Sequence, residues 1–571
     1  MQTIYYNGTI ITMEPDHPIV QAVAAEDGRI RFAGKLEEAK ARYPQAEGMD
    51  LEGHTMLPAF IDAHSHLSSA ASSMLQASLE ECASPEEIKE RLQAFARDRR
   101  IPKGQWIIAK GYDHNMLAGK AHPTRIFLDQ CCPEHPVVLQ HASGHIGVFN
   151  TMALEALKVT ERSAAPGGGK IDFQRGYMEE NAFFEYQKKV PMPDMGALME
   201  AYEEAQKLYA SYGITTIQEG YAVKEMVPLY RYLLGQNRIW LDLVSYVAPK
   251  DGELFYDVFS EHASGYQKHM RIGGYKIFLD GSPQGRTAWM RTPYRQDEKS
   301  EQKIDGNEEG RNAKQAEKKE EGKAQEEYCG YGTMSDDQVQ DAVKLAVCQK
   351  RQILAHCNGD AAAQQYIRVL EAVGNEAAWQ ETVQDEPDQS NEEFRRPSPI
   401  AGIRPVMIHA QLLGLDQLEA VKSLGIIPSF FVAHVWHWGD THIRNFGLER
   451  ASIISPARSA LQQKILFTFH QDTPVIAPDM METVWCAVNR RTREGVILGE
   501  EERIDVWSAL EAVTSHAAYQ YGEEANKGSI RAGKTADFVV LDQNPLTVEK
   551  EKIREIKVLK TVKEGKVIFE R

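Results

Sequence analysis

The sequence lacks the features that would place it in a membrane or on nucleic acid. Its 571 residues contain no uninterrupted apolar run of about 18 residues, so no membrane-spanning helix is expected. Its formal net charge is −17, whereas nucleic-acid-binding proteins usually carry a basic face. The first residues show no basic segment followed by an apolar one, so they predict no signal peptide.

Cysteine is also scarce, and its spacing argues against a disulfide or zinc scaffold. The chain has seven cysteines without a CxxC pair, and Cys131 and Cys132 are adjacent. An odd number of cysteines without paired spacings favours free thiols in a reducing compartment. The sequence therefore predicts a cytoplasmic protein. Hydrophobic residues make up 42% of the chain, which is enough for a large core and too many for a disordered protein.

Short apolar segments recur along the middle of the chain, each followed by a helical pattern. Eight such segments are candidate strands: 56–62, 214–218, 241–247, 272–279, 353–356, 406–409, 426–432 and 465–470. Eight buried parallel strands are the number that a (β/α)8 barrel of the TIM type requires, so we predict this α/β fold. A doubly wound open sheet is the alternative. It would need a glycine-rich dinucleotide loop after its first strand, and residues 60–64 offer none.

The remaining segments suggest how the chain divides into domains. Residues 1–55 and 528–571 contain short strands, and we predict that they form one small β-sandwich domain; two unrelated appendages are the alternative. The barrel is predicted over 56–527. Residues 68–212 are too long for a βα loop and are expected to form a subdomain inserted after the first barrel strand. Residues 297–327 are rich in Glu, Lys and Gln and are expected to be a disordered insert.

The end of the first barrel strand carries two histidines with one residue between them, His64 and His66. Because side chains alternate along a strand, both imidazoles are expected on the same side of it. Two neutral imidazoles placed in this way can chelate one divalent cation. Taken alone the pattern is weak, because a chain with 18 histidines often contains such a spacing by chance.

Four other candidate strands also carry a potential metal-site residue, and in a parallel barrel all of these residues would point to one rim. They are Lys276, His356, His409 and Asp472. Each has a structural explanation of its own. A histidine in a strand is often a satisfied core residue, and an aspartate before Thr-Pro often caps a turn. Five independent coincidences on one rim are less probable than one joint metal site, which we predict there.

These motifs, in this order, resemble the amidohydrolase superfamily, and within it the YtcJ-like branch that includes N-substituted formamide deformylases. The resemblance covers nearly the whole chain. It begins with PAFIDAHSHL and continues through GYDHNML, HPVVLQHASGHIGVFNTMALEAL, YKIFLDGSPQGRTAWM, AHCNGDAA and IHAQLL. It ends with FTFHQDTPV and KGSIRAGKTADFVVLDQNP.

The resemblance implies roles for the residues on the predicted rim. His64 and His66 would bind a first metal, and His356 and His409 a second one. Asp472 would be both a ligand and the catalytic general base. Lys276 occupies the position at which such enzymes carry a lysine carboxylated by carbon dioxide. An unmodified ammonium has no acceptor and cannot bind a cation, so the number of ions, one or two, depends on this modification. Zinc is favoured by the imidazole-rich set, with iron, manganese and nickel as alternatives.

The implied activity is hydrolysis of an amide-type, non-peptide carbon–nitrogen bond in a small-molecule substrate, through a metal-activated hydroxide. A deaminase or cyclic-amide hydrolase on the same scaffold is the first alternative. A non-catalytic metal-binding protein is the second, and the complete ligand set speaks against it. The assembly state is left open, with a homodimer as one candidate.

Six further residues are candidate substrate contacts because they lie in or near motifs at the barrel mouth and in the inserted segment. They are Tyr112, Asp113, His145, Asn150, Asp280 and Arg286. Turn and ion-pair roles are the equally weighted alternative.

The sequence also departs from the branch at positions near the predicted ligands. His470-Gln471 precedes Asp472 where the branch usually has Gly-Ser, and Ile408 stands where it often has Glu. None of these departures removes a predicted metal ligand, but they prevent the substrate from being named by resemblance.

Overall fold

The computed structural model describes residues 2–191, 194–295, 327–382 and 399–571. The predicted insert at 297–327 therefore lies outside the described residues, except for Glu327. The chain divides into two compact units, Met1–His66 with Lys207–Arg571 and Leu67–Gln206. The second unit overlaps the range 68–212 that the sequence assigns to an inserted subdomain, and the exact domain division stays a prediction.

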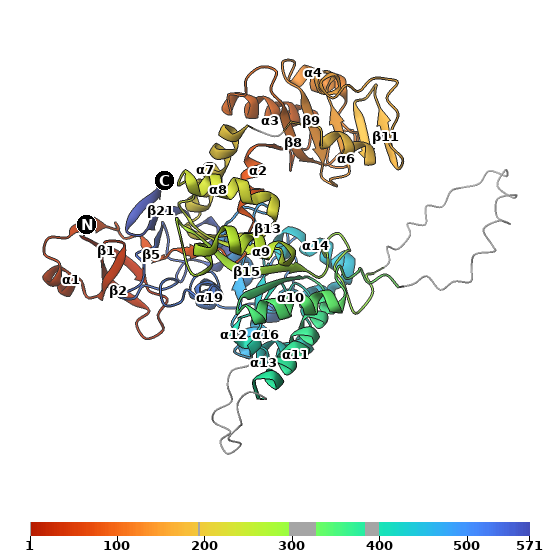
Figure 1. Cartoon of the computed structure of the whole chain (residues 1–571). Helices are drawn as coiled ribbons and strands as arrows, with labels where there is room; N and C mark the ends of the chain where they lie inside the picture. The colour runs from red at the N-terminus through yellow and green to blue at the C-terminus, as the bar shows by residue number, and fades with distance from the viewer. Residues whose placement is uncertain (1, 192–193, 296–326, 383–398) are drawn as a thin grey trace. The chain divides into compact units, whose positions relative to one another are not determined.

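The first unit contains eight parallel strands that are hydrogen-bonded to one another in chain order (Figure 1). They are β6 (Phe60–Ile61), β13 (Ile214–Ala222), β14 (Asp242–Val247), β15 (Met270–Phe278), β16 (Gln352–Cys357), β17 (Val406–His409), β18 (Ile427–Phe430) and β19 (Thr468–Phe469). All residues of β14, β17 and β18 are buried, as expected of parallel strands covered on both faces. The order and direction of the strands confirm the α/β, TIM-barrel-like architecture.

The first predicted strand, 56–62, is divided between two sheets. Thr55–Pro58 (β5) pairs with strands from the two chain ends, whereas β6 pairs with β13. The change of partner follows Pro58, which has no N–H to donate to a ladder. The Ala59 N–H then donates to the Asp537 carbonyl at 3.0 Å, and the Phe60 N–H donates to the Gly213 carbonyl at 2.9 Å. The chain thus crosses from one sheet to the other within three residues.

Strands from both ends of the chain share one sheet, in the order β22-β21-β20-β5-β1-β2-β3, with β4 on β1. We call it the terminal sheet. Its other strands are β1 (Gln2–Ile11), β2 (Ile19–Glu26), β3 (Arg29–Gly34), β4 (Glu47–Asp50), β20 (Phe538–Leu541), β21 (Val558–Lys563) and β22 (Lys566–Glu570). Tyr5 and Phe538 pack edge to face in its core, with ring centroids 5.0 Å apart. Its description as a separate β-sandwich domain stays a prediction.

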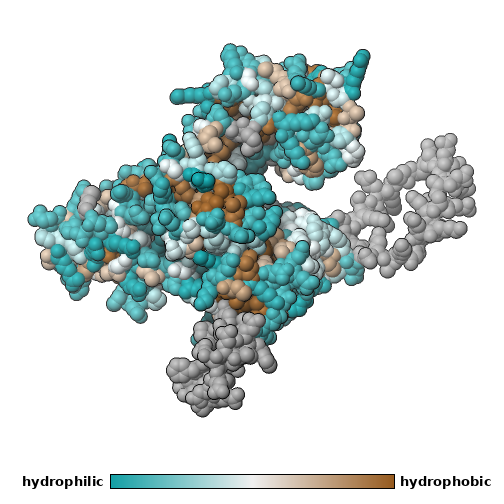
Figure 2. Space-filling model, viewed as in Figure 1, coloured by the Kyte–Doolittle hydropathy of each residue, from teal (hydrophilic) through white to brown (hydrophobic). Residues whose placement is uncertain are grey.

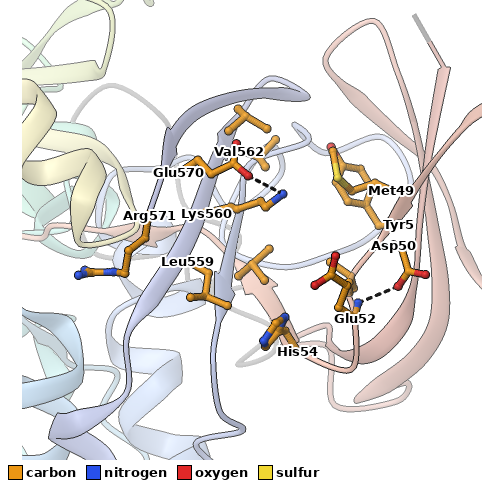
Figure 3. Close-up of a pocket in the computed structure, with 13 residues that line it drawn as sticks. Tyr5, Met49, Asp50, Glu52, His54, Leu559, Lys560, Val562, Glu570 and Arg571 are labelled. Atoms are coloured by element: carbon orange, nitrogen blue, oxygen red, sulfur yellow. Dashed lines mark hydrogen bonds and ion pairs between the residues drawn. The ribbon is translucent and has the colours of Figure 1, made fainter.

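A pocket of about 210 Å³ lies in the terminal sheet (Figure 3). The Lys560–Glu570 ion pair, with its atoms 2.9 Å apart, lies at this pocket. The Glu52 N–H donates to Asp50 across the pocket from it. These residues come from the terminal sheet and its loops, and not from the ends of the parallel strands.

The second unit contains a mixed sheet in the order β11-β12-β10-β9-β8-β7. Its strands are β7 (Ala77–Ser78), β8 (Ile107–Tyr112), β9 (Val137–His141), β10 (Ile146–Phe149), β11 (Gly169–Asp172) and β12 (Tyr177–Glu180). Its helices are α2 (Leu67–Met74), α3 (Pro85–Asp98), α4 (Arg125–Cys131), α5 (Thr151–Ala156), α6 (Asn181–Gln187) and the first part of α7 (Met195–Ser211). Buried apolar residues of β8, β9, α3 and α4 form its core.

Helices follow most of the parallel strands of the first unit. They are α8 (Val227–Gly235), α9 (Gly252–Val258), α10 (Asp336–Cys348), α11 (Asp360–Thr382), α12 (Pro399–Gly402), α13 (Leu418–Ser423), α14 (His434–Phe446), α15 (Leu448–Ser452), α16 (Ala457–Gln462), α17 (Met480–Asn489), α18 (Val506–Ala512) and α19 (Ser515–Gln520); α1 (Leu36–Arg42) follows β3. A capping box starts α10: the Gln338 N–H donates to the Ser335 hydroxyl, and the Ser335 N–H donates to the Gln338 side chain.

Within the described ranges, no helix combines the length and apolar content needed to cross a membrane. Figure 2 shows a face that is mostly hydrophilic, with separate hydrophobic patches. All seven cysteines are unpaired, as the sequence predicts.

A buried ionic cluster connects the parallel sheet to the terminal sheet. Asp242 on β14 lies 2.9 Å from the Lys563 ammonium on β21 and also contacts Lys527. All three side chains are less than 10% exposed. Burial raises the pKa of Asp242, but the two ammonium groups and His269 outweigh this effect and hold its pKa well below the usual range.

We expect Asp242→Asn to lower the free energy of unfolding by about 3 kcal/mol, the lower end of the range for a broken buried pair. The variant removes the carboxylate between two buried ammonium groups, whereas Lys527 keeps Glu523 and Lys563 keeps the exposed Glu564. Chemical denaturation of the purified variant measures the loss. Asp336→Asn is the control, since its ion pair with Arg368 is about half exposed and should cost less than about 1 kcal/mol. Equal losses in the two variants would contradict a structural role for the buried cluster.

Candidate metal centre

The loops that follow the first and last parallel strands meet at one point. The His66 N–H donates to the Thr473 carbonyl at 2.9 Å, which joins the segment after β6 to the segment after β19. Ligand atoms of His64, His66 and Asp472 consequently lie within 4.8 Å of one another. The structure therefore brings together three of the residues predicted on the rim, although more than 400 positions separate Asp472 from the two histidines.

The carboxylate of Asp472 is arranged as a cation ligand would be. Its Oδ1 is buried and accepts no hydrogen bond, although His64 Nε2 and His66 Nε2 lie only 3.5 and 3.3 Å away. A buried carboxylate oxygen normally accepts hydrogen bonds, so one without a partner indicates that another positive group belongs there. Two imidazole nitrogens facing one carboxylate oxygen are a donor set that divalent zinc and related ions accept.

Gln218, on β13, determines which nitrogen of His64 faces the centre. Its amide nitrogen donates to the Ala63 carbonyl at 3.0 Å and to the Tyr521 hydroxyl at 2.9 Å. Its amide oxygen is therefore turned towards His64 and accepts from Nδ1 at 2.5 Å. Nε2 keeps its lone pair and points at Asp472, which is the orientation a metal ligand needs.

His66 lies between two carboxylates. Its Nε2 faces Asp472, and its Nδ1 lies 3.8 Å from Oε1 of Glu219. The Tyr230 hydroxyl donates to the other oxygen of Glu219 at 2.9 Å and fixes it in place. Burial alone would lower the pKa of His66, but the two carboxylates raise it to about 9. Asp472 in turn has a lowered pKa: burial raises it, and His66, His470 and Lys276 outweigh that effect.

Lys276 is fully buried on β15, and its Nζ lies 3.2 Å from His64 Nε2. Burial lowers its pKa to about 7, because an ammonium loses its hydration there. A substantial fraction of this side chain is therefore the neutral amine at neutral pH.

His356 and His409 form the second pair of predicted ligands, at the ends of β16 and β17. Their rings lie edge to face with centroids 4.5 Å apart. His409 Nε2 lies 3.9 Å from Oδ2 of Asp472, so the aspartate faces His64 and His66 with one oxygen and His409 with the other. Asp472 therefore lies between the two histidine pairs.

Asp280, predicted as a substrate contact, holds His356 and its loop in place. Its Oδ1 lies 3.0 Å from His356 Nδ1, and its side chain is fully buried. The N–H groups of Asn358, Gly359 and Trp289 all donate to its carboxylate. The contact with Nδ1 makes Nε2 of His356 the acceptor nitrogen, which the Asn358 side-chain amide contacts at 3.4 Å. These contacts give Asp280 a positioning role; its contact with a substrate stays a prediction. Arg286 donates to the Asn445 side chain at 2.9 Å, and its contact with a substrate also stays a prediction.

The other four predicted substrate contacts lie in the second unit, Leu67–Gln206. Asn150 caps α5: its amide oxygen accepts from the Ala153 N–H at 2.9 Å, so it has a structural role of its own. Asp113 caps a turn at Asn115, Tyr112 is buried, and His145 is exposed beside Glu180. Their contact with a substrate stays a prediction.

Three supporting residues were not among the sequence predictions: Gln218, Glu219 and His470. His470 is fully buried, with Nε2 3.1 Å from Nδ1 of His409 and Nδ1 2.9 Å from the Ser429 hydroxyl. The sequence marks it only as a departure from the family pattern. Gln218 and Glu219 lie two and one residues before Gly220 on a buried strand, where polar residues are unusual; that was the available signal.

Two other groups in the described ranges have metal-compatible spacing but other contacts. Asp242 and His269 belong to the buried cluster with Lys527 and Lys563, whose positive charges disfavour a cation. In the second unit, His114 Nδ1 and His141 Nε2 lie 3.0 Å apart beside Asp113. There the Ser143 N–H points at His141 Nδ1, which makes Nε2 the protonated donor of an ordinary hydrogen bond.

Comparisons with known proteins identify the family to which this chain belongs. The sequence profile described as the amidohydrolase family matches residues 47–569. The amidohydrolase YtcJ of Bacillus subtilis (strain 168) is 25% identical over 593 residues and is covered completely, as is this chain. The N-substituted formamide deformylase of Arthrobacter pascens is 24% identical over 590 residues, 99% of this chain and 98% of that protein. A metal-dependent hydrolase of Pyrococcus horikoshii OT3 has a similar fold, with a TM-score of 0.72, 23% identity and coverage of 96% and 99%.

Gly220 gives a test of the centre that replaces none of the proposed ligands. A Cβ at this position would lie 2.6 Å from the ring of His64 and 2.9 Å from that of His66, closer than real contacts allow. We expect Gly220→Ala to displace the imidazoles and to lower the metal content of the purified protein, measured by elemental analysis, at least severalfold. Gly235→Ala is the control, because a Cβ there meets no atom within 4 Å. Equal metal content in the two variants would remove His64 and His66 from the site.

Proposed function

The chain belongs to the amidohydrolase family, and we propose that the strand-end cluster is the centre at which this metal-dependent hydrolase cleaves carbon–nitrogen bonds. The proposed metal ligands are His64, His66, Lys276, His356, His409 and Asp472. The observation that carries the proposal is the buried Oδ1 of Asp472, which faces two imidazole nitrogens and accepts no hydrogen bond. Zinc is the proposed ion, since imidazole nitrogens dominate the set.

A bound divalent ion would supply a water of lowered pKa and would polarise the substrate carbonyl. The protein's own groups supply the proton transfer. Asp472 is ionised, since its pKa is lowered, and Oδ2 remains available on the side of His409. We propose that this carboxylate takes a proton from the attacking water and passes it to the nitrogen that leaves.

Lys276 is the proposed bridge between two ions. A neutral amine adds carbon dioxide to form a carbamate and releases one proton, and the carbamate offers two oxygens as ligands. The support is that Lys276 is buried beside His64 and that burial lowers its pKa to about 7. Unmodified, it offers no acceptor, and the centre would then hold a single ion.

We propose an N-acyl or N-formyl amide as the substrate. The support is the relative from Arthrobacter pascens, which is named for N-substituted formamides and is similar over 99% of this chain. Deamination and cyclic-amide hydrolysis are the alternative outcomes of a substrate panel. A cytoplasmic location is proposed on the support of the unpaired cysteines. Dimerisation stays a prediction.

The test of the mechanism is Asp472→Asn, which keeps a neutral oxygen in place but removes the base. The substrate is the best one from a panel of amides, formamides, hydantoins and aminopurines. We expect turnover to fall by about 10²–10⁴-fold, the usual range for a lost acid–base group, and metal content to fall much less. Turnover and metal content are measured on the same preparation.

The control is Asp98→Asn, an exposed carboxylate in the second unit, which should keep wild-type turnover. If Asp472 only caps the turn before Pro474, its asparagine variant will also retain turnover close to the wild-type value. That result would remove Asp472 from the mechanism.

A further inference from the structure

We propose that a cavity beside the metal centre is the subsite for an uncharged alkyl or aryl group carried by the amide substrate. The proposal rests on the proposed function and adds to it the chemical class of the substituent. The cavity measures about 560 Å³, within the range of about 300–1,000 Å³ typical of small-molecule sites. Its lining residues come from β13, β15, the segment that follows β14, and α10 with the residues before it. The helix α10 packs against β15, and both are labelled in Figure 1.

The side chains that line this cavity are mainly apolar and come from four separate segments. The apolar ones are Tyr221, Ala248, Pro249, Ile277, Phe278, Met334, Ala342 and Leu345. The polar ones are Lys276, which is buried and belongs to the centre, and the exposed Lys250, Thr333, Gln338 and Asp341. The two rim charges, one of each sign, give no net preference for a charged ligand. An apolar lining with an exposed polar rim fits an uncharged group.

Phe278 is the wall that the cavity and the metal centre share. Its ring centroid lies 5.4 Å from Nζ of Lys276 and 5.5 Å from the ring of His356. Phe278 and Tyr221 both line the cavity, and their rings pack edge to face with centroids 4.9 Å apart. Lys276 and Phe278 are therefore residues that the centre and the cavity have in common.

The position of Phe278 next to the centre follows from its place on β15. Phe278 follows Lys276 by two residues on β15, so both side chains point to the same side of the strand. On the cavity side, Gln338, Asp341, Ala342 and Leu345 recur at the three- and four-residue spacing of one helix face. The capping box that starts α10 fixes the beginning of this face.

The chemistry of the lining predicts how the substrate is selected. Aromatic edges and aliphatic side chains gain contact area with each added methylene and offer no partner for a charge. Each methylene that becomes buried should raise kcat/KM about 4-fold. From an N-methyl to an N-butyl amide, three methylenes should give about a 60-fold rise if all of them are buried.

The experiment uses the metal-loaded, full-length protein and a series of N-alkylformamides from methyl to butyl, followed by amine release. We expect kcat/KM to rise along the series. Ala342→Trp and Leu345→Trp place an indole in the cavity and should bring the butyl-to-methyl ratio of kcat/KM close to one. Gln340→Trp, on α10 but not in the lining, should leave the ratio at the wild-type value. A ratio that does not change in either filled variant would overturn the subsite.

A second measurement separates this proposal from the proposed function. Binding of 4-fluorotoluene, followed by its fluorine NMR signal, requires no catalysis. We expect the wild type and Gln340→Trp to bind it, and the two filled variants to lose at least tenfold in affinity. If no amide is hydrolysed but this pattern of binding holds, the proposed reaction is wrong, whereas the cavity is confirmed as a site that binds uncharged groups. If amides are hydrolysed but the probe binds all four proteins equally, the cavity is not the subsite.

Discussion

Every ligand of the candidate centre depends on the fact that eight parallel strands follow one another in chain order. Parallel strands in such a sheet end at the same edge, so residues at their carboxyl ends gather there from distant parts of the chain. The hydrogen bond from the His66 N–H to the Thr473 carbonyl joins the two ends of this series. At this junction Asp472 lies beside His64 and His66 and turns its second oxygen towards His409.

Burial then determines the chemistry of the centre. In a low-dielectric surrounding, the amine of Lys276 loses much of its tendency to hold a proton, whereas Asp472 remains ionised because His66, whose own pKa is raised, lies beside it. Buried polar groups must be held by partners, and here each partner also selects an orientation. Gln218 turns Nε2 of His64 towards the centre, and Asp280 does the same for His356. Phe278 packs against His356 of the polar centre and also lines the apolar cavity.

Much of this arrangement could be predicted from the sequence, because hydrophobic periodicity and strand-end histidines are local patterns. The eight strands, their parallel order and the grouping of His64, His66 and Asp472 fall into this class. The division of the first strand at Pro58 was not predicted, since both halves are equally apolar and only the pairing partners differ. The roles of Gln218, Glu219 and His470 were missed because each depends on a contact with a residue on another strand. Asp280 shows the same limit: its position near a motif was visible, but its three backbone donors were not.

The central claim is that hydrolysis takes place at a metal centre on this edge of the sheet. The most direct measurement is the turnover of the best amide substrate during stepwise removal of metal with a chelator and its restoration with zinc, with metal content determined in each sample. The account predicts that turnover falls and returns in proportion to the bound metal. Full turnover in protein that retains no metal would contradict it.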